Sequence, residues 1–369
     1  MMVRETDVFI IGGGPAGLAA AIAARQRGLE VTVADGARAP IDKPCGEGLM
    51  PDGRAALARL GIEIPSASSH PFRGIRFVSG GLHVDASFPQ ASGMGVRRTV
   101  LHSLMVERAE ALGIRMLWQT PVTGLHAEGV TLEDRRVLAR WVVGADGGQS
   151  LVRKWAGLEH FRTNRTRFAF RRHYRVAPWS DCMEIHWGVK CQIYVTPVAS
   201  DEICVALVSH DPHLRLEAAL KYFPEIASRL QESEQTSAER GATSSMRRLE
   251  SVSRGRVALV GDASGGVDCI SGEGLCLAFR QGDLLAECFA EGSLRRYQER
   301  HSELWRRPAM MARLMLALDW NVSFRQRVMR AFATDPQIFR RMLAMHVGAL
   351  SPAGFAANGL ALGWQMLRA

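Results

Sequence analysis

A glycine-rich segment close to the N-terminus has the residue types and the spacing to hold a nucleotide pyrophosphate. Its pattern is G-x-G-x-x-G, in the run Gly12-Gly13-Gly14-Pro15-Ala16-Gly17. In this pattern the first glycine permits a tight turn out of a strand, the second lets the backbone approach the phosphates, and the third lets the next helix pack close to the sheet. Phosphates bound there would face a helix N-terminus, whose amides and dipole favour anions.

The residues around this run supply the elements that must position it. The apolar stretch 8–11 predicts a strand before the turn, and the alanine-rich stretch up to Gly28 predicts a helix after it. A further apolar stretch, 29–34, predicts a second strand that ends at Asp35. An acidic side chain about 20 residues beyond the turn is suited to a ribose hydroxyl pair. We therefore expect a nucleotide-binding strand-helix-strand unit.

Two later segments repeat the order of apolar strand, tight turn and helix. Residues 141–147 (WVVGADG) and residues 257–262 (VALVGD) each run from an apolar stretch into glycine and aspartate. The first continues to Arg153 and the second to Leu275. Both patterns predict strands that return to the sheet of the first unit.

Together the three segments resemble the FAD-dependent superfamily that contains the single-component aromatic hydroxylases, the geranylgeranyl reductases and the flavin halogenases. The marks of that superfamily are G-x-G-x-x-G, D-G-x-x-S-x-x-R and G-D-A, which correspond here to GGGPAG, DGGQSLVR and GDA. The resemblance extends to about Ala290.

The resemblance implies a set of cofactor contacts, residue by residue. It assigns the pyrophosphate to the glycine-rich turn, the adenosine ribose to Asp35, the FAD phosphates to Arg98 and the ribityl chain to Asp262. It implies that Asp146 bridges FAD and an incoming nicotinamide, and that Ser150, which is equally suited to cap a helix, shapes that turn with Arg153. The implied cofactor-binding residues are Gly12, Gly14, Pro15, Ala16, Gly17, Asp35, Arg98, Asp146, Asp262, Gly272, Gly274 and Leu275, the last three against the flavin ring.

The loop 42–49 (DKPCGEGL) is similar to a segment that the geranylgeranyl reductases place near the flavin with a cysteine in it. Cys45 is therefore a candidate active-site residue, with Lys43 as a neighbour that lowers its pKa; the alternative is a small buried apolar residue. Glu47 is a candidate proton donor or acceptor, or else a solvated or helix-capping carboxylate.

The middle of the chain, residues 167–209, predicts an antiparallel sheet that holds the substrate. Strand alternation puts Arg172 and Tyr174 on one face, and Glu184 and His186 on another. Of these, Arg172 and His186 are candidate catalytic residues, although a histidine in a strand often has only a structural role. The polar and aromatic residues able to line a pocket are Arg172, His173, Tyr174, His186, Trp187 and Tyr194.

The resemblance favours an NAD(P)H-dependent monooxygenase that hydroxylates an aromatic or polyketide/quinone-like small molecule through a flavin C4a-hydroperoxide. Because there is no second G-x-G-x-x-G, NAD(P)H is expected to bind transiently as the reductant. The first alternative is geranylgeranyl-reductase-like reduction of isoprenoid double bonds, although the reductase pattern Y-x-W-x-F-P keeps only Tyr194 and Pro197 in residues 192–197. The others are a flavin halogenase, which lacks its W-x-W-x-I-P here, and a non-catalytic flavoprotein.

The expected fold class is mixed α/β (α+β), because 369 residues with 47% hydrophobic content exceed what one core usually organises. A Rossmann-like FAD-binding domain (residues 1–73, 95–160 and 250–290) is interleaved with an antiparallel-sheet substrate domain (74–94 and 161–249), plus C-terminal helices that form a cap (291–369). Seven cysteines without a C-x-x-C pair predict buried thiols in a reducing compartment, and neither disulfides nor a metal site.

Charge and the two ends of the chain bear on partners and location. The net charge of +9 comes from scattered arginines, which favours anionic cofactors and a small-molecule substrate, aromatic or lipophilic, over nucleic acid. The N-terminus lacks a signal-sequence pattern, which predicts a cytoplasmic protein. Residues 342–367 lack Lys, Arg, Asp and Glu. A docked pair of cap helices is expected there, with a bilayer-spanning helix or a peripheral membrane contact as alternatives.

Overall fold

A largely parallel sheet carries the glycine-rich turn. The computed structural model describes residues 5–133, 135–163, 166–350 and 352–368. Strands β21, β11, β1, β2 and β8 lie side by side in that order and run parallel, β20 pairs antiparallel at the edge, and β9 and β10 extend β11. The bounds are β1 (Thr6–Ile11), β2 (Val31–Ala34), β8 (Arg115–Leu117), β9 (Val122–His126), β10 (Gly129–Leu132), β11 (Arg135–Gly144), β20 (Ser253–Arg254) and β21 (Val257–Leu259).

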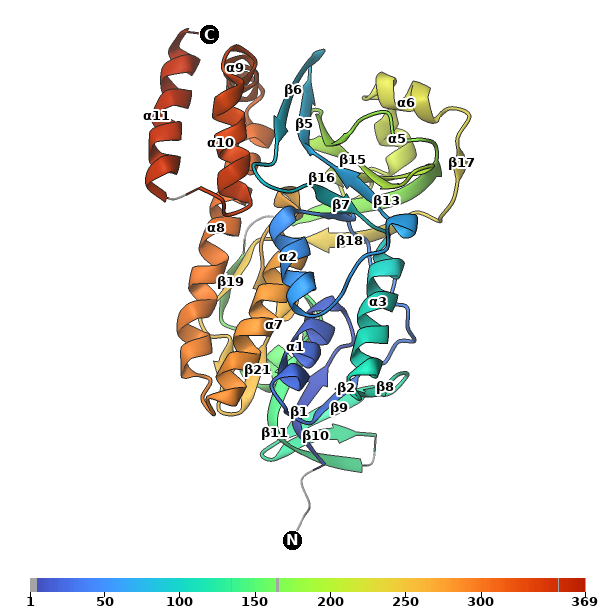
Figure 1. Cartoon of the computed structure of the whole chain (residues 1–369), viewed down its shortest axis with the longest axis vertical. Coiled ribbons are helices and arrows are strands. Elements are labelled where there is room, and N and C mark those ends of the chain that lie inside the picture. Colours follow the sequence, from blue (N-terminus) through green and yellow to red (C-terminus); the bar gives the residue numbers. More distant parts are fainter. Residues whose placement is uncertain (1–4, 134, 164–165, 351, 369) are drawn as a thin grey trace.

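Three helices pack together against this sheet (Figure 1). They are α1 (Pro15–Gln26), α3 (Arg98–Ala111) and α7 (Gly274–Ala290). The alanines of α1 are fully buried, and a Cβ on Gly282 of α7 would lie 2.8 Å from the backbone nitrogen of Ala20. Small side chains on both helices therefore allow their axes to approach closely, which fixes the turn that precedes α1.

A second sheet forms the other half of the molecule, in the order β17-β13-β16-β15-β14-β5-β6, with β18 on β13. The predicted antiparallel arrangement is confirmed except at β5 and β14, which pair in parallel. These two strands are far apart in the sequence, so no hairpin forces them to be antiparallel. The bounds are β5 (Gly74–Ser79), β6 (Leu82–Ser87), β13 (Arg167–Arg175), β14 (Cys182–Trp187), β15 (Cys191–Ala199), β16 (Glu202–Ser209), β17 (Glu234–Gln235) and β18 (Arg240–Ser244).

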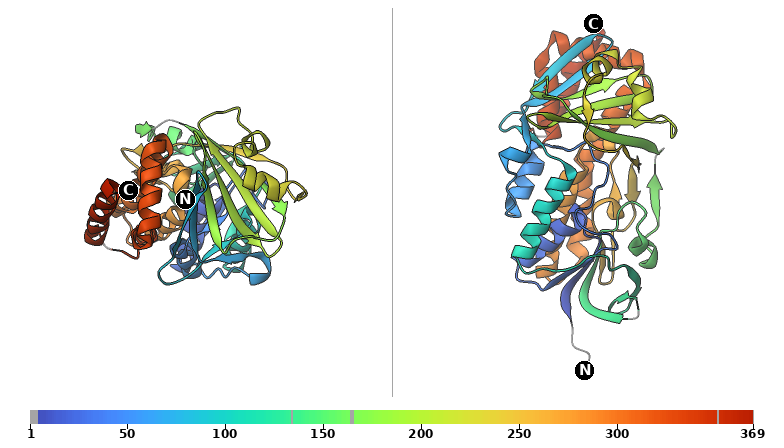
Figure 2. Two further views of the ribbon diagram at one scale, coloured as in Figure 1. Left: turned by 90° about the horizontal axis from the view of Figure 1, so that it is seen from above. Right: turned by 90° about the vertical axis from the view of Figure 1, so that its right-hand side faces the viewer.

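Helices cover both faces of the second sheet (Figure 2). On one face lie the two predicted short helices, α5 (Leu216–Leu220) and α6 (Pro224–Leu230). On the other lie α8 (Arg295–Trp320), α9 (Val322–Thr334) and α10 (Pro336–His346). The mixed α/β fold class is thus confirmed, with two sheets and a helical cap.

Short elements join the two halves. Two three-stranded sheets have the orders β3-β7-β4 and β12-β19-β22. Their bounds, with those of the short helices, are β3 (Gly48–Leu49), β4 (His70–Phe72), β7 (Gly93–Gly95), β12 (Phe161–Thr163), β19 (Arg247–Leu249), β22 (Gly265–Gly266), α2 (Pro51–Arg59), α4 (Leu151–Trp155), and the 3₁₀ helices η1 (Ser66–Ser68), η2 (Gly261–Ser264) and η3 (Cys269–Ser271).

Helix α8 spans both halves of the molecule (Figure 1). In its first half, the Tyr297 hydroxyl donates to the carbonyl of Leu259 in β21 at 2.7 Å. In its second half, the carboxylate of Asp319 is 2.9 Å from the guanidinium of Arg167 in β13, and both side chains are almost fully buried. Pro308 lies between these two contacts. The helical cap is therefore attached to both sheets by polar contacts as well as by apolar packing.

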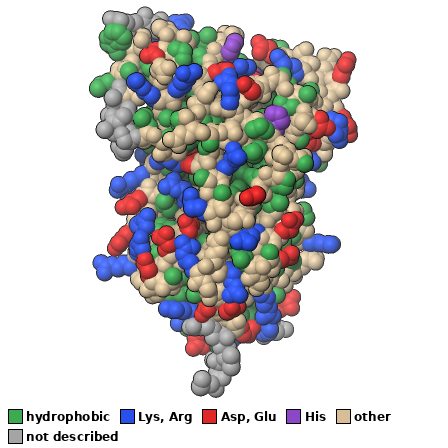
Figure 3. All heavy atoms as spheres, in the orientation of Figure 1, with side chains coloured by type: hydrophobic (Ala, Val, Ile, Leu, Met, Phe, Trp, Pro, Cys, Tyr) green, Lys and Arg blue, Asp and Glu red, His purple; other side chains and the backbone are tan. Residues whose placement is uncertain are grey.

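The apolar C-terminal stretch is divided between α10 and α11 (Pro352–Arg368). Within the described ranges, no helix combines the length and the apolar character that a membrane crossing needs. Helix α11 exposes Leu360 (79%) and Trp364 (50%). Basic and acidic side chains are interspersed on the face shown in Figure 3, as the scattered arginines predict.

Candidate flavin site and adjoining cavity

The three glycine-containing segments meet at the carboxyl ends of β1, β11 and β21. A Cβ on Gly12 would lie 2.4 Å from the carbonyl oxygen of Ala145, and one on Gly261 would lie 2.6 Å from the Cβ of Ala16. Arg153 of the middle segment donates to the carbonyl of Ala263 at 3.2 Å. Glycine is thus required where two backbones cross, and the ends of three parallel strands form one site.

The glycine-rich turn leaves the N-terminus of α1 open. Gly14 is the N-cap, and no side chain accepts a hydrogen bond from the first turn of the helix. A Cβ on Gly14 would meet no atom within 4 Å, whereas one on Gly17 would lie 1.9 Å from the carbonyl oxygen of Gly12. Gly17 therefore serves helix packing, while the space beside Gly14 and the free amides fit a pyrophosphate. Asp35, at the end of β2, accepts from the amide of Gly13 at 2.7 Å.

Positive charge gathers next to this turn. The Lys43 ammonium is 2.8 Å from the Asp262 carboxylate. Burial alone would raise the pKa of Asp262, but Lys43 and Arg98 hold that pKa below its ordinary value. The Arg98 side chain is buried, and its Nε has no hydrogen-bond partner among the described residues. A buried guanidinium with an unused donor fits an anionic group such as a cofactor phosphate.

The N-terminus of α7 is a second open helix end. Gly272 has φ +68°, which lets the chain turn from η3 into the helix, and no side chain caps the first turn. A Cβ on Gly274 would again meet no atom within 4 Å. The amides of this turn fit a group that carries negative charge, as the resemblance implies for the flavin ring.

The middle segment has both a structural and an open polar group. The hydroxyl of Ser150 accepts from the amide of Arg153 at 2.9 Å, so Ser150 caps α4. One oxygen of Asp146 accepts from the amide of Val152 at 3.0 Å, while Oδ1 is buried and has no hydrogen-bond partner within the described part of the chain. Asp146 Oδ1 is therefore available to a bound group.

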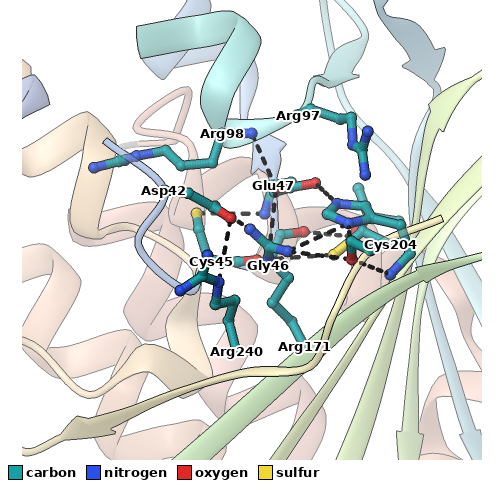
Figure 4. A network of polar contacts seen from close by, with 12 residues as sticks. Asp42, Cys45, Gly46, Glu47, Arg97, Arg98, Arg171, Cys204 and Arg240 are labelled. Carbon is teal, nitrogen blue, oxygen red and sulfur yellow. Dashed lines mark hydrogen bonds and ion pairs between the residues drawn. The ribbon is translucent and has the colours of Figure 1, made fainter. Parts of the chain in front are cut away.

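Glu47 lies at the centre of a buried charge network (Figure 4). Its carboxylate accepts from the backbone amide of Arg98 at 2.9 Å and is 2.6 Å from Nε2 of His173. The guanidinium of Arg171 is 3.7 Å away and also pairs with Asp42. Because every polar atom of the Glu47 carboxylate is engaged, this network connects the loop 42–49 to the second sheet rather than presenting a solvated carboxylate.

Glu47, His173 and Cys204 are a group of potential metal ligands with their donor atoms within 4.8 Å of one another. Their chemistry does not fit a metal ion. The two carboxylate oxygens of Glu47 are already used, and Arg171 adds positive charge. Burial also raises the pKa of the Cys204 thiol well above its ordinary value, which disfavours the thiolate that binds metals.

The loop cysteine is a protonated thiol. Burial raises the pKa of Cys45, against the opposing charge of Arg98. The expectation that Lys43 lowers this pKa is wrong, because the Lys43 ammonium pairs with Asp262 instead.

We therefore expect Cys45 to react slowly with alkylating reagents. At pH 7, iodoacetamide should modify it at least about tenfold more slowly in the native protein than in the urea-unfolded chain, since only the thiolate reacts. Mass spectrometry of the peptide that contains Cys45 measures both rates. The native rate should rise steeply with pH above 8, and equal rates in the two states at pH 7 would contradict a raised pKa.

The two other catalytic candidates lie away from the site. On β13, Arg171 and His173 face Glu47, so Arg172 points to the opposite face, where it is 4.0 Å from Glu239. His186 is 2.8 Å from Glu184, as expected for two residues on one face. Alternation was thus correct about which residues share a face, but it does not reveal which face points to the cofactor.

An apolar cavity adjoins the turn that leads into α7. The second sheet, η3, α8 and α10 enclose it, with about 440 Å³ of space between its lining atoms. A Cβ on Gly272 would be 3.6 Å from Met50, one of the lining residues. The lining residues are Met50, Ile75, Phe77, Met183, Ile185, Tyr194, Ile270, Ser271, Met311, Met315, Phe339, Met342, Leu343 and His346. Five of the fourteen are methionines, whose flexible side chains adapt to ligands of varied shape.

The fold and the site define an FAD-dependent oxidoreductase. The chain belongs to the FAD binding domain family, whose sequence pattern matches residues 5–293. The superfamily resemblance seen in the three segments is thereby confirmed.

Relatives in this family have several activities. The menaquinone reductase of Mycobacterium tuberculosis (strain H37Rv) is 29% identical over 321 residues, which are 79% of this chain and 78% of the relative. Digeranylgeranylglycerophospholipid reductase 1 of Methanothermobacter thermautotrophicus is 35% identical over 175 residues, 43% of each chain. The 6-methylpretetramide 4-monooxygenase of Streptomyces rimosus is 31% identical over 176 residues, 43% of this chain and 42% of the relative.

Solved structures share the fold. A flavoprotein/dehydrogenase from Cytophaga hutchinsonii superimposes with a TM-score of 0.78 at 20% identity, over 93% of this chain and 92% of the other. At this identity the likeness concerns the arrangement of the elements alone.

Proposed function

We propose that this protein is an FAD-dependent reductase that saturates double bonds in a lipophilic, isoprenoid-like molecule. The observation that carries the proposal is the apolar cavity beside the turn into α7. Its lining contains only three polar side chains, Tyr194, Ser271 and His346. Such a lining suits a hydrocarbon chain and offers little to a small aromatic acid, whose charge would be buried without a partner.

The relatives support the same direction. A menaquinone reductase matches along 79% of the chain, and a digeranylgeranylglycerophospholipid reductase matches along 43%. The printed names of both relatives describe reductases. The change to the Y-x-W-x-F-P pattern leaves Tyr194 in the cavity wall, where its hydroxyl donates to the carbonyl of Ile270 at 2.9 Å.

Saturation of a double bond needs two electrons and two hydrogens, and bound FAD supplies the electrons. The residues of this chain would bind and orient the substrate and exclude water. The open helix ends of α1 and α7, with Arg98 and Asp262, would hold the cofactor, and NAD(P)H is proposed as its transient reductant. The cavity keeps the substrate's chain against the turn into α7, where the resemblance puts the flavin ring.

Reduction of geranylgeraniol by the FAD-loaded enzyme tests this proposal. Under anaerobic conditions with dithionite as reductant, mass spectrometry should detect a product that has gained two hydrogens for each saturated bond. Met315→Trp fills the cavity and should lower the rate at least about tenfold while FAD remains bound. Leu314→Trp is the matched control, because Leu314 is 36% exposed on the same helix and outside the lining.

Monooxygenation is the second candidate, favoured by the match to 6-methylpretetramide 4-monooxygenase and by the absence of a second nucleotide-binding glycine pattern. Under that mechanism, NADPH oxidation in air should be stimulated by a phenolic or quinone-like ligand, and labelled oxygen should enter the product. Oxygen incorporation without any anaerobic saturation of isoprenoids would replace the reductase proposal.

A further inference from the structure

One end of the apolar cavity contains two buried polar side chains that are incompletely satisfied. His346, at the end of α10, lines the cavity and is 8% exposed. Its Nδ1 is 3.6 Å from Oε2 of Glu273, the residue that precedes α7, which is 2% exposed. That distance allows an ion pair but is too long for a hydrogen bond.

Neither group finds another partner at this end. Glu273 Oε2 has no hydrogen bond, and none involves His346, in the part of the chain that the structure describes. The other oxygen of Glu273 is 3.4 Å from the guanidinium of Arg307, which is held by Asp52 at 2.7 Å. Burial raises the pKa of Glu273, against the charges of His346 and Arg307. Buried polar atoms without partners are uncommon and call for a ligand or another explanation.

A hydroxyl group is the smallest ligand group that satisfies both side chains at once. It can donate to Glu273 Oε2 and accept from an N–H of His346. An ether or a carbonyl oxygen can only accept, so it would leave the Glu273 oxygen without a donor in a buried place. We propose that the Glu273–His346 pair binds a hydroxyl group at the polar end of the lipophilic substrate. This inference rests on the proposed function for the apolar part of the ligand, and it extends that function to the substrate's head group.

The position of the pair explains its selectivity. Glu273 lies between Gly272 and Gly274, in the turn that the resemblance puts against the flavin ring. His346 comes from the helical cap, so a ligand bound by both residues joins the cap to this turn. A hydroxyl fixed there would hold the chain of the ligand at a constant depth in the cavity, with the same carbon atoms beside the turn into α7 each time.

Equilibrium binding of geranylgeraniol and of its methyl ether to the FAD-loaded protein tests this proposal. The two probes share the hydrocarbon chain, and only the first can donate a hydrogen bond. Quenching of tryptophan fluorescence should report at least about tenfold tighter binding of the alcohol. His346→Leu and Glu273→Leu should remove the preference for the alcohol, and His346→Gln should restore part of it. Met342→Leu, a change in the cavity wall, should affect both probes equally.

A hydroquinone with a prenyl chain, compared with its dimethyl ether, distinguishes a phenolic hydroxyl from an alcohol as the natural head group. Equal binding of geranylgeraniol and its ether by the wild-type protein would overturn the hydroxyl inference and leave the reductase proposal intact. An unchanged preference in both leucine variants, with normal FAD content, would assign the hydroxyl to other residues and also overturn it. Conversely, a preference that depends on His346 would support the inference even if no saturated product forms.

Discussion

Gly14→Asp is expected to prevent FAD binding and to leave the FAD-free protein as stable as before. Gly14 has φ −71° and ψ 174°, which any residue can adopt, and open space lies where a side chain would begin. Aspartate is a favoured N-cap, so its carboxylate would accept from the first amides of α1. It would thereby occupy the donors, and oppose the charge, of a pyrophosphate. We expect at least about a 100-fold loss of affinity, or roughly 2.7 kcal/mol.

Flavin fluorescence titration measures the affinity, and thermal unfolding of the FAD-free protein measures stability. Gly14→Asn has nearly the same shape and capping ability without the charge, so it should lose less affinity and separates charge from bulk. Gly17→Ala should behave in the opposite way. Its Cβ would lie 1.9 Å from the carbonyl oxygen of Gly12, so the FAD-free protein should lose about 1–3 kcal/mol of stability. Retention of FAD by Gly14→Asp within threefold of wild type would refute the assignment of the turn.

Arg167→Met should destabilise the protein by about 3–5 kcal/mol. The guanidinium of Arg167 is 2.9 Å from Asp319 and 3.8 Å from Asp268, and all three side chains are at most 2% exposed. It also donates to the Gln192 side chain at 2.7 Å. Removal of the arginine leaves two buried carboxylates without their cation, and burial already raises the pKa of Asp268. Equilibrium unfolding in urea measures the change.

An exposed ion pair provides the control for Arg167→Met. Arg295 and Glu299 are 3.3 Å apart in the first turns of α8, with side chains 89% and 62% exposed. Arg295→Met should therefore change the free energy of unfolding by less than about 0.5 kcal/mol. In the double variant Arg167→Met with Asp319→Leu, the loss should be smaller than the sum of the two single losses, because the second change removes one unpaired charge. Additive losses would show that Arg167 and Asp319 do not stabilise each other.

The flavin half of the molecule was predictable from sequence because its requirements are local. Gly12 and Gly17 are needed where a backbone oxygen lies within 2.4 Å of a would-be Cβ, and such needs fix both the residue type and the spacing. The alternation of strands likewise gave the second sheet and the shared face of Glu184 and His186.

The substrate half was less predictable because its contacts join distant segments. The 2.6 Å contact of Glu47 with His173 spans 126 residues, and no local pattern marks it. Alternation could not decide which face of β13 meets the loop 42–49, so Arg172 was chosen where its neighbours Arg171 and His173 form the network. His346 lies in a stretch that reads only as apolar helix, and its pairing with Glu273 depends on how the cap docks. One signal was present: an acidic residue between two glycines, in a turn that must approach a cofactor.

Helix α8 also has a consequence for how such proteins diversify. Before Pro308 it is attached to the strand that carries the third glycine segment, through Tyr297 and Leu259, and after Pro308 it supplies Met311 and Met315 to the cavity. Pro308 has no N–H to continue the helical hydrogen bonds, so the backbone already tolerates a discontinuity there. Recombination near this residue would exchange the distal part of the cavity wall and keep the Tyr297 attachment intact. Substrate preference can then change in a single genetic event, without selection having to rebuild the turns at the carboxyl ends of β1, β11 and β21.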